Sequence, residues 1–174
     1  MTENAFKQPT IHTSTTVSGW HDLFLSMAYV IAMKSKDPST RTGCVITDPQ
    51  HRVLSVGFNG FPRGISDYPD RYADRPLKYK LIAHCDLNAI FAAAHHGISL
   101  KGCTMYLTHP PCSQCFKGII QVGITEVIWP IRNSFDCDPE KIGWRTSQTG
   151  VDFMASEAGV KLTRYEGTIG GSNQ

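Results

Sequence analysis

The chain has 174 residues, of which 41% are hydrophobic and 18% charged, and its formal net charge at pH 7 is +2. This size predicts one domain with its own core, and so weak a charge argues against a basic face that binds polynucleotides. Six cysteines at this length do not suggest a secreted disulfide scaffold, so we expect reduced or metal-bound cysteines in a cytoplasmic protein.

The two ends of the chain are predicted to lie outside the folded domain. Residues 1–18 are polar, lack the apolar run of a signal peptide and are expected to be flexible, as is the tail at 167–174. The longest hydrophobic stretch, 23–33, is too short to span a bilayer, so no membrane segment is expected. Residues 19–166 therefore form the predicted single domain.

The first half of this domain is predicted to contain one helix and two strands. Residues 20–34 have apolar side chains at helical spacing, which indicates an amphipathic helix. Residues 43–47 and 52–58 are rich in β-branched side chains, and Asp48-Pro49-Gln50 between them favours a hairpin turn. Residues 59–75 contain glycines, prolines and charges, and we predict a long functional loop there.

Helices and strands alternate in the second half. We predict a helix at 84–96 that ends at Gly97, a strand at 104–108 and a helix at 112–121 that ends before Gly123. A strand at 125–129, a helix at 146–158 and a strand at 160–165 follow. This order predicts an α/β fold, a three-layer α/β/α sandwich with a central mixed five-stranded sheet.

Two groups of metal-ligand residues stand at the starts of two predicted helices. Cys112 and Cys115 are three residues apart, so one helical turn brings both sulfurs to one metal, and a helix N-terminus favours thiolates. His84 is the candidate third ligand, from the neighbouring helix. Zinc is bound by four ligands in a tetrahedral arrangement. Three protein ligands therefore predict a Zn²⁺ site whose fourth position is open for water.

Two other interpretations of these residues are open at this stage. A Cys-x-x-Cys motif between a strand and a helix is also typical of a redox pair, and Asp86 as a fourth ligand would make the zinc structural. The joint occurrence of His84-Cys85-Asp86 with Pro111 before the first cysteine favours the catalytic site. His109, just before this loop, is expected in the pocket wall rather than as a ligand.

The two groups together resemble the zinc signature of nucleobase and nucleotide deaminases, His-x-Glu followed by Pro-Cys-x-x-Cys. The likeness covers residues 20–129 and includes the segments 35–40, 57–64, 88–90 and 118–123. On these motifs the chain is similar to the cytidine and deoxycytidylate deaminase superfamily, closest to its deoxycytidylate (dCMP) branch. The resemblance implies a cytidine deaminase-like fold, a homo-oligomer, and zinc-dependent hydrolysis of dCMP to dUMP and ammonia.

The resemblance also implies roles for residues around the zinc. Asp86 would move protons, Asn59 would hold the sugar hydroxyl, and the backbone amide of Cys85 would bond the base carbonyl. A turn residue is the alternative for Asn59. Trp129 is a candidate to stack on the base, with a place in the core as its alternative.

A nucleotide substrate also needs cations for its phosphate. Arg41, Arg63 and Lys80 are the candidates, although each taken singly is also consistent with a solvated surface charge. The resemblance further associates the loop that contains Gly60, Arg63 and Gly64 with a nucleoside triphosphate effector.

One residue departs from the family pattern: Asp86 stands where the signature has glutamate. Its carboxylate is one bond shorter in reach, and a displacement of about 1 Å at a catalytic group can cost about 100-fold in rate. We favour the interpretation in which Asp86 still transfers protons in the reaction. The alternatives are a deaminase of another amino-substituted base, an attenuated nucleotide-binding regulator, and an engineered substitution.

Overall fold

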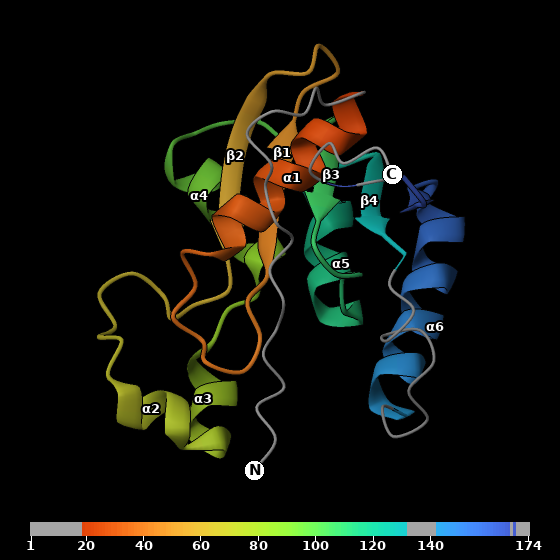
Figure 1. The fold of residues 1–174 in the computed structure, drawn as a ribbon. Helices are drawn as coiled ribbons and strands as arrows, with labels where there is room; N and C mark the ends of the chain where they lie inside the picture. Colours follow the sequence, from red (N-terminus) through yellow and green to blue (C-terminus); the bar gives the residue numbers. More distant parts are fainter. Residues whose placement is uncertain (1–18, 132–141, 168, 170–174) are drawn as a thin grey trace.

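The structure, a computed structural model, describes residues 19–131, 142–167 and 169. Its strands form one sheet in the order β2-β1-β3-β4-β5 (Figure 1). β1 pairs antiparallel with both β2 and β3, whereas β3, β4 and β5 run parallel, so the predicted mixed sheet is confirmed. The strands are β1 (Gly43–Thr47), β2 (Val53–Phe58), β3 (Thr104–Leu107), β4 (Glu126–Pro130) and β5 (Lys161–Tyr165).

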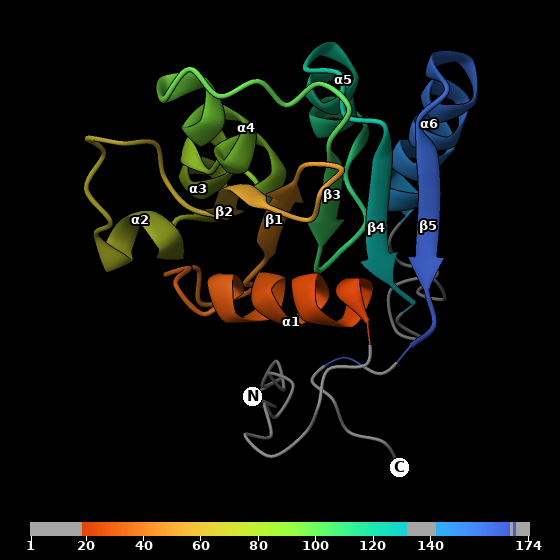
Figure 2. The same cartoon turned by 90° about the horizontal axis from the view of Figure 1, so that it is seen from above.

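Helices cover both faces of this sheet, as Figure 2 shows. α1 (Trp20–Ala32) lies across one face, and α4 (Cys85–His95), α5 (Ser113–Gln121) and α6 (Ile142–Ala158) lie on the other. The predicted three-layer α/β/α architecture is therefore confirmed.

Two hydrophobic clusters, one on each face, hold the layers together. Successive strand residues point to opposite faces, and the clusters divide the strands in that way. Val45 of β1 packs with α1, whereas its neighbour Ile46 packs with α4 and α5. Tyr106 and Met105 of β3 divide in the same manner. β1 is buried along its whole length because both helical layers cover it.

Two glycines permit close contacts between helices and strands. A Cβ atom at Gly43 would lie 1.9 Å from the carbonyl oxygen of Ala28 in α1, and one at Gly57 would lie 2.2 Å from that of Cys85 in α4. Both neighbours are backbone atoms, which have little freedom to move away. Any larger residue at Gly57 would therefore displace the start of α4.

The segment between β2 and α4 is where the structure departs most from the prediction. The predicted loop at 59–75 contains α2 (Pro69–Ala73), and α3 (Arg75–Leu81) follows it. Each helix has a proline in its first turn, and the Asp74 side chain accepts a hydrogen bond from the Leu77 amide at 3.1 Å. Proline occurs in loops and is also favoured in the first turn of a helix, so the composition of 59–75 alone does not distinguish the two.

The remaining predicted boundaries agree with the structure to within two residues, except that α6 begins at Ile142 rather than at 146. Residues 1–18 lie outside the described residues, as do 168 and 170–174 of the predicted tail. The domain limits of 19–166 stay a prediction. In the described part of the chain, no helix combines the length and the hydropathy that crossing a membrane requires.

Candidate metal centre and its pocket

Three side chains from two helices converge at the predicted metal site. The Nδ1 atom of His84 lies 3.6 Å from the sulfur of Cys112 and 3.4 Å from that of Cys115, and the two sulfurs are 3.4 Å apart. His84 is the N-cap residue of α4, and Cys112 is the N-cap residue of α5. In the described residues this trio is the one group of three or more such side chains that could hold a metal ion.

The spacing of the three atoms fits zinc. A tetrahedral ion with Zn–S bonds of about 2.3 Å and Zn–N bonds of about 2.0 Å separates neighbouring ligand atoms by roughly 3.5–3.8 Å. The observed N–S separations of 3.6 and 3.4 Å lie within about a tenth of an ångström of the lower value, which applies to an N–S pair, and the S–S separation of 3.4 Å is about 0.4 Å shorter than the upper value, which applies to two sulfurs. Asp86 does not belong to the group, so the three side chains leave one position open.

The three groups also influence one another's protonation. A hydrogen bond to Cys115 and the neighbouring His84 lower the pKa of Cys112 to about 4. The pKa of Cys115 is raised because its sulfur hydrogen-bonds that of Cys112, and burial adds to the effect. A hydrogen bond to the Cys112 sulfur raises the pKa of His84. Thiolate at Cys112 is the form that binds metal.

Backbone contacts between β2 and α4 hold His84 in place. Gly60 and Ala83 form an isolated antiparallel bridge, with N–H to O distances of 3.1 and 2.9 Å. The Asn88 side chain donates to the carbonyl oxygen of Phe58 at 2.8 Å. The residue before the histidine and the first turn of α4 are thus tied to the segment that follows β2.

Helix α6 anchors the loop that carries the cysteines. The Ser147 hydroxyl accepts a hydrogen bond from the backbone amide of Ser113 at 2.8 Å, which satisfies an amide at the start of α5. The Gln148 side chain donates to the carbonyl oxygen of Pro111, also at 2.8 Å. No local sequence pattern indicates this support, because its two sides are 34 and 37 residues apart in the chain.

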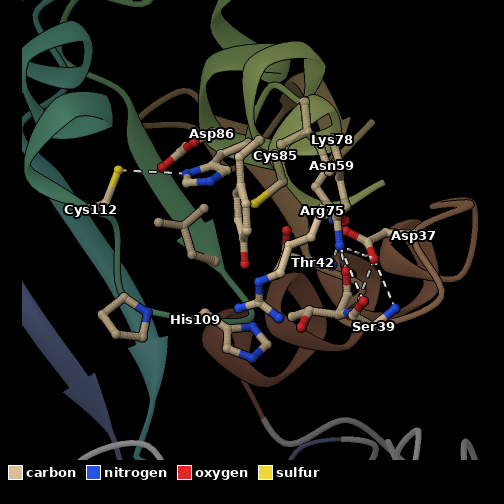
Figure 3. A pocket seen from close by; sticks show the side chains of 16 residues that line it. Asp37, Ser39, Thr42, Asn59, Arg75, Lys78, Cys85, Asp86, His109 and Cys112 are labelled. Carbon is tan, nitrogen blue, oxygen red and sulfur yellow. Dashed lines mark hydrogen bonds and ion pairs between the residues drawn. The ribbon is translucent and has the colours of Figure 1, made fainter. Parts of the chain in front are cut away.

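A pocket of about 760 Å³ opens beside the trio, within the usual size range of small-molecule sites (Figure 3). Asp86 and Cys85 line it, and only 3% of Asp86 is exposed. Burial raises the pKa of the Asp86 carboxyl, and one of its oxygens accepts a hydrogen bond from the Leu87 amide at 2.8 Å. Burial likewise raises the pKa of the Cys85 thiol.

Asn59 lines the same pocket, but its amide is already engaged in a buried network. Its Nδ2 atom donates to the Thr40 carbonyl at 2.8 Å and to the Asp37 carboxylate at 3.4 Å. Its Oδ1 atom accepts from the Thr42 amide at 2.8 Å. Both donors are used, and the carbonyl oxygen retains acceptor capacity. Asn59 therefore fixes the loop at 37–42 in the structure.

The other predicted substrate residues lie away from the pocket wall. Trp129 is 4% exposed and belongs to the hydrophobic cluster under α4, α5 and α6, so the structure places it in the core. The three predicted phosphate candidates are exposed, and none of them lines the pocket: Arg41, Arg63 and Lys80. Gly60 and Gly64 do not line it either, and their role in effector binding stays a prediction.

Helix α3 contributes pocket residues that the sequence analysis missed. Arg75, Lys78 and Tyr79 line the pocket, and His109 also belongs to its wall, as expected. The proline after Arg75 and the capping Asp74 were the available signals for this helix. Once a helix is assumed, the spacing of three and four residues places the three side chains on one face.

Comparison with known proteins identifies the family. The family model for the cytidine and deoxycytidylate deaminase zinc-binding region matches residues 18–131. The chain belongs to the cytidine and deoxycytidylate deaminase family. Zinc is accordingly its cofactor, and the three converging side chains of this deaminase are positioned as possible ligands.

Several relatives resemble this deaminase over most of their length. An uncharacterized deaminase from the luxG 3′ region of Aliivibrio fischeri is 41% identical over 84% of this chain and 94% of its own. The human deoxycytidylate deaminase is 38% identical over 84% of this chain and 79% of its own. These matches confirm the predicted family and the predicted class of enzyme, a hydrolytic C–N deaminase.

A solved structure supports the fold. The dCMP deaminase of cyanophage S-TIM5, solved in complex with dCMP and dUMP, has a TM-score of 0.63. It is 19% identical and covers 83% of this chain and 95% of its own. At that identity the likeness shows the fold of this deaminase alone.

Proposed function

We propose that this chain is a zinc-dependent hydrolase that converts dCMP and water to dUMP and ammonia. The observation that carries the proposal is the convergence of His84, Cys112 and Cys115 beside a buried carboxylate in the wall of a pocket. The human relative, itself a deoxycytidylate deaminase, supports dCMP as the substrate.

In this proposal the imidazole of His84 and the sulfurs of Cys112 and Cys115 hold the zinc. A zinc ion with three protein ligands supplies a nucleophile derived from water at neutral pH, because it lowers the pKa of coordinated water to about 7. The bridge at Gly60 and the contacts from α6 keep the ligands in place.

Asp86 moves the protons of the reaction. Its carboxylate accepts the first proton of the attacking water and transfers it to the ring nitrogen next to the amine-bearing carbon. It then accepts the second proton of the former water and transfers it to the departing amine, which leaves as ammonia. Burial raises the pKa of Asp86, which brings the carboxyl closer to the working pH and suits an acid that is also a base.

The proposed substrate contacts use hydrogen-bonding groups of the pocket wall that can still bind a ligand. The backbone amide of Cys85 binds the base carbonyl, as the family resemblance implies. A sugar hydroxyl donates to Oδ1 of Asn59, because both protons of the Asn59 amide are already used in the network at 37–42. Asn59 thus positions the loop as well as the sugar.

The remaining parts of the proposal concern the setting of the enzyme. The relatives include the deoxycytidylate deaminases of Homo sapiens and of Enterobacteria phage T4. These relatives do not favour the alternative functions, deamination of another amino-substituted base and nucleotide binding by an attenuated regulator. We propose a cytoplasmic homo-oligomer of one zinc-dependent domain at 19–166, with a nucleoside triphosphate effector near Gly60, Arg63 and Gly64. These points rest on the family resemblance.

The test is ammonia release from purified, zinc-loaded protein with aminated nucleosides, nucleoside monophosphates and triphosphates. We expect dCMP to be the best substrate, and we expect Asp86→Asn to lose at least about 100-fold in kcat because an amide neither accepts nor releases a proton at the working pH. The control is Asp152→Asn on the exposed face of α6, which should retain the parent rate.

Two results would contradict the proposal. Ammonia from a purine or a modified base alone would exclude dCMP as the substrate. Absence of ammonia with every substrate, together with tight binding of dUMP, would favour the nucleotide-binding regulator.

A further inference from the structure

The pocket has two ends of different chemistry. His84, Cys112 and Asp86 line one end, and side chains of α3 and the loop at 37–42 line the other. Figure 3 shows the labelled side chains of Asp86 and Cys112 on one side, and those of Arg75, Lys78 and Asp37 across the pocket from them. The lysine and the arginine that line the pocket, Lys78 and Arg75, both lie at this second end.

Lys78 is not available to a ligand, because an internal partner already neutralises it. It is 6% exposed, and its Nζ atom lies 2.7 Å from a carboxylate oxygen of Asp37, which is 3% exposed. It also donates to the Ser39 hydroxyl at 3.2 Å. Removal of either partner of such a pair leaves a buried charge, so the pair is retained as a neutral unit.

Arg75 differs from Lys78 in every one of these respects. It is exposed at the mouth of the pocket, and no ion pair among the described residues involves it. Its guanidinium lies 5.2 Å from the centroid of the Tyr79 ring, which limits its orientations. Figure 3 shows the Arg75 guanidinium directed into the pocket.

We propose that Arg75 binds the 5′-phosphate of the substrate and so selects a nucleoside monophosphate over the nucleoside. This inference rests on the proposed function, because a cytosine amine at the metal end leaves the sugar and phosphate to extend toward α3. A guanidinium presents two parallel N–H donors that match two phosphate oxygens. Arg75 takes the role for which the sequence suggested Arg41, Arg63 and Lys80.

The size of the effect follows from the strength of hydrogen bonds to charged groups. Such bonds correspond to roughly 10- to 100-fold in an equilibrium constant. A nucleoside lacks the phosphate and gains nothing from the arginine. The discrimination between dCMP and deoxycytidine should therefore fall by this factor when Arg75 is removed.

The experiment measures kcat and KM with dCMP and with deoxycytidine, and dUMP binding by calorimetry, for the parent and three variants. Arg75→Met should lower kcat/KM for dCMP 10- to 100-fold, mainly through KM, and leave deoxycytidine unchanged. Arg75→Lys should restore part of the loss. Arg71→Met is the matched control, because Arg71 of α2 lies 5.1 Å from the centroid of the Tyr68 ring, at the N-cap of that helix, and does not line the pocket.

The binding measurement separates this inference from the proposed function. If the parent does not deaminate dCMP but binds dUMP more tightly than Arg75→Met does, the phosphate subsite stands and the proposed reaction fails. Equal dUMP affinity of the parent and Arg75→Met would overturn the subsite. An equal loss with dCMP and deoxycytidine would overturn it as well, as would a parent that does not bind dUMP.

Discussion

Asp86 occupies the position of the family's glutamate, and its carboxylate lies about one carbon–carbon bond, roughly 1.5 Å, closer to the backbone of α4. The side chain is 3% exposed and accepts a hydrogen bond from the Leu87 amide at 2.8 Å. The carboxylate is thus fixed against the first turn of the helix. A substrate must approach this turn closely for the proton transfer to take place.

We expect the substitution Asp86→Glu to lower kcat for dCMP by about 10- to 100-fold. The longer side chain moves the carboxylate into the pocket, past the place to which the substrate is fitted, and a displacement of about 1 Å can cost about 100-fold. Steady-state kinetics with the zinc content measured in parallel would check this result.

The control is Asp86→Asn, which keeps the length of the side chain and removes the proton carrier. A Glu variant faster than the parent would contradict the prediction. It would show that the aspartate is too short for the reaction and that the natural chain is attenuated.

At the scale of elements, the contact between β2 and α4 positions the metal centre. We expect Gly57→Ala to lower the free energy of unfolding by about 3 kcal/mol or more, because overpacking of a tight contact costs about 1–3 kcal/mol and here both neighbours are backbone. A Cβ atom would lie 2.2 Å from the Cys85 carbonyl and 2.5 Å from the Ala89 amide nitrogen. For a chain of this size the melting temperature should fall by roughly 6–12 °C.

The matched control is Gly60→Ala in the same region of the chain. A Cβ atom there would meet only the Phe58 ring, at 3.5 Å, an ordinary contact distance. Calorimetric melting should find Gly60→Ala within about 2 °C of the parent, as for surface changes of about 0.5 kcal/mol. Equal melting temperatures for the two variants would contradict the role of the close contact.

The sequence predicts those features of the site that depend on local spacing. Cys112 and Cys115 lie on one helical turn, so their convergence follows from helix geometry alone. Asn59 and Lys78 could not be placed in this way, because their partners lie 17 to 41 residues away in the chain. The phosphate candidates Arg41, Arg63 and Lys80 do not line the pocket, and charge alone does not show which cation faces a pocket.

At the scale of the whole molecule, the two hydrophobic clusters are independent of the metal ligands. The cluster under α1 and the one under α4, α5 and α6 contain none of the three ligand residues. Each cluster joins helices to the same buried strands, so both layers remain packed without zinc. The metal instead connects two helix starts, those of α4 and α5, on one face of the sheet.

Removal of zinc should therefore lower the stability of the molecule without unfolding it. Free zinc at roughly 1,000 times its Kd contributes about 4 kcal/mol, so a chelator should lower the melting temperature by roughly 8–16 °C. Circular dichroism should show an unchanged helix content at 25 °C, and added zinc should restore the transition. A Cys115→Ser variant, which lacks one ligand, should show little shift with chelator. Outright unfolding of the chelated parent would show that the two clusters do not hold the fold without the metal.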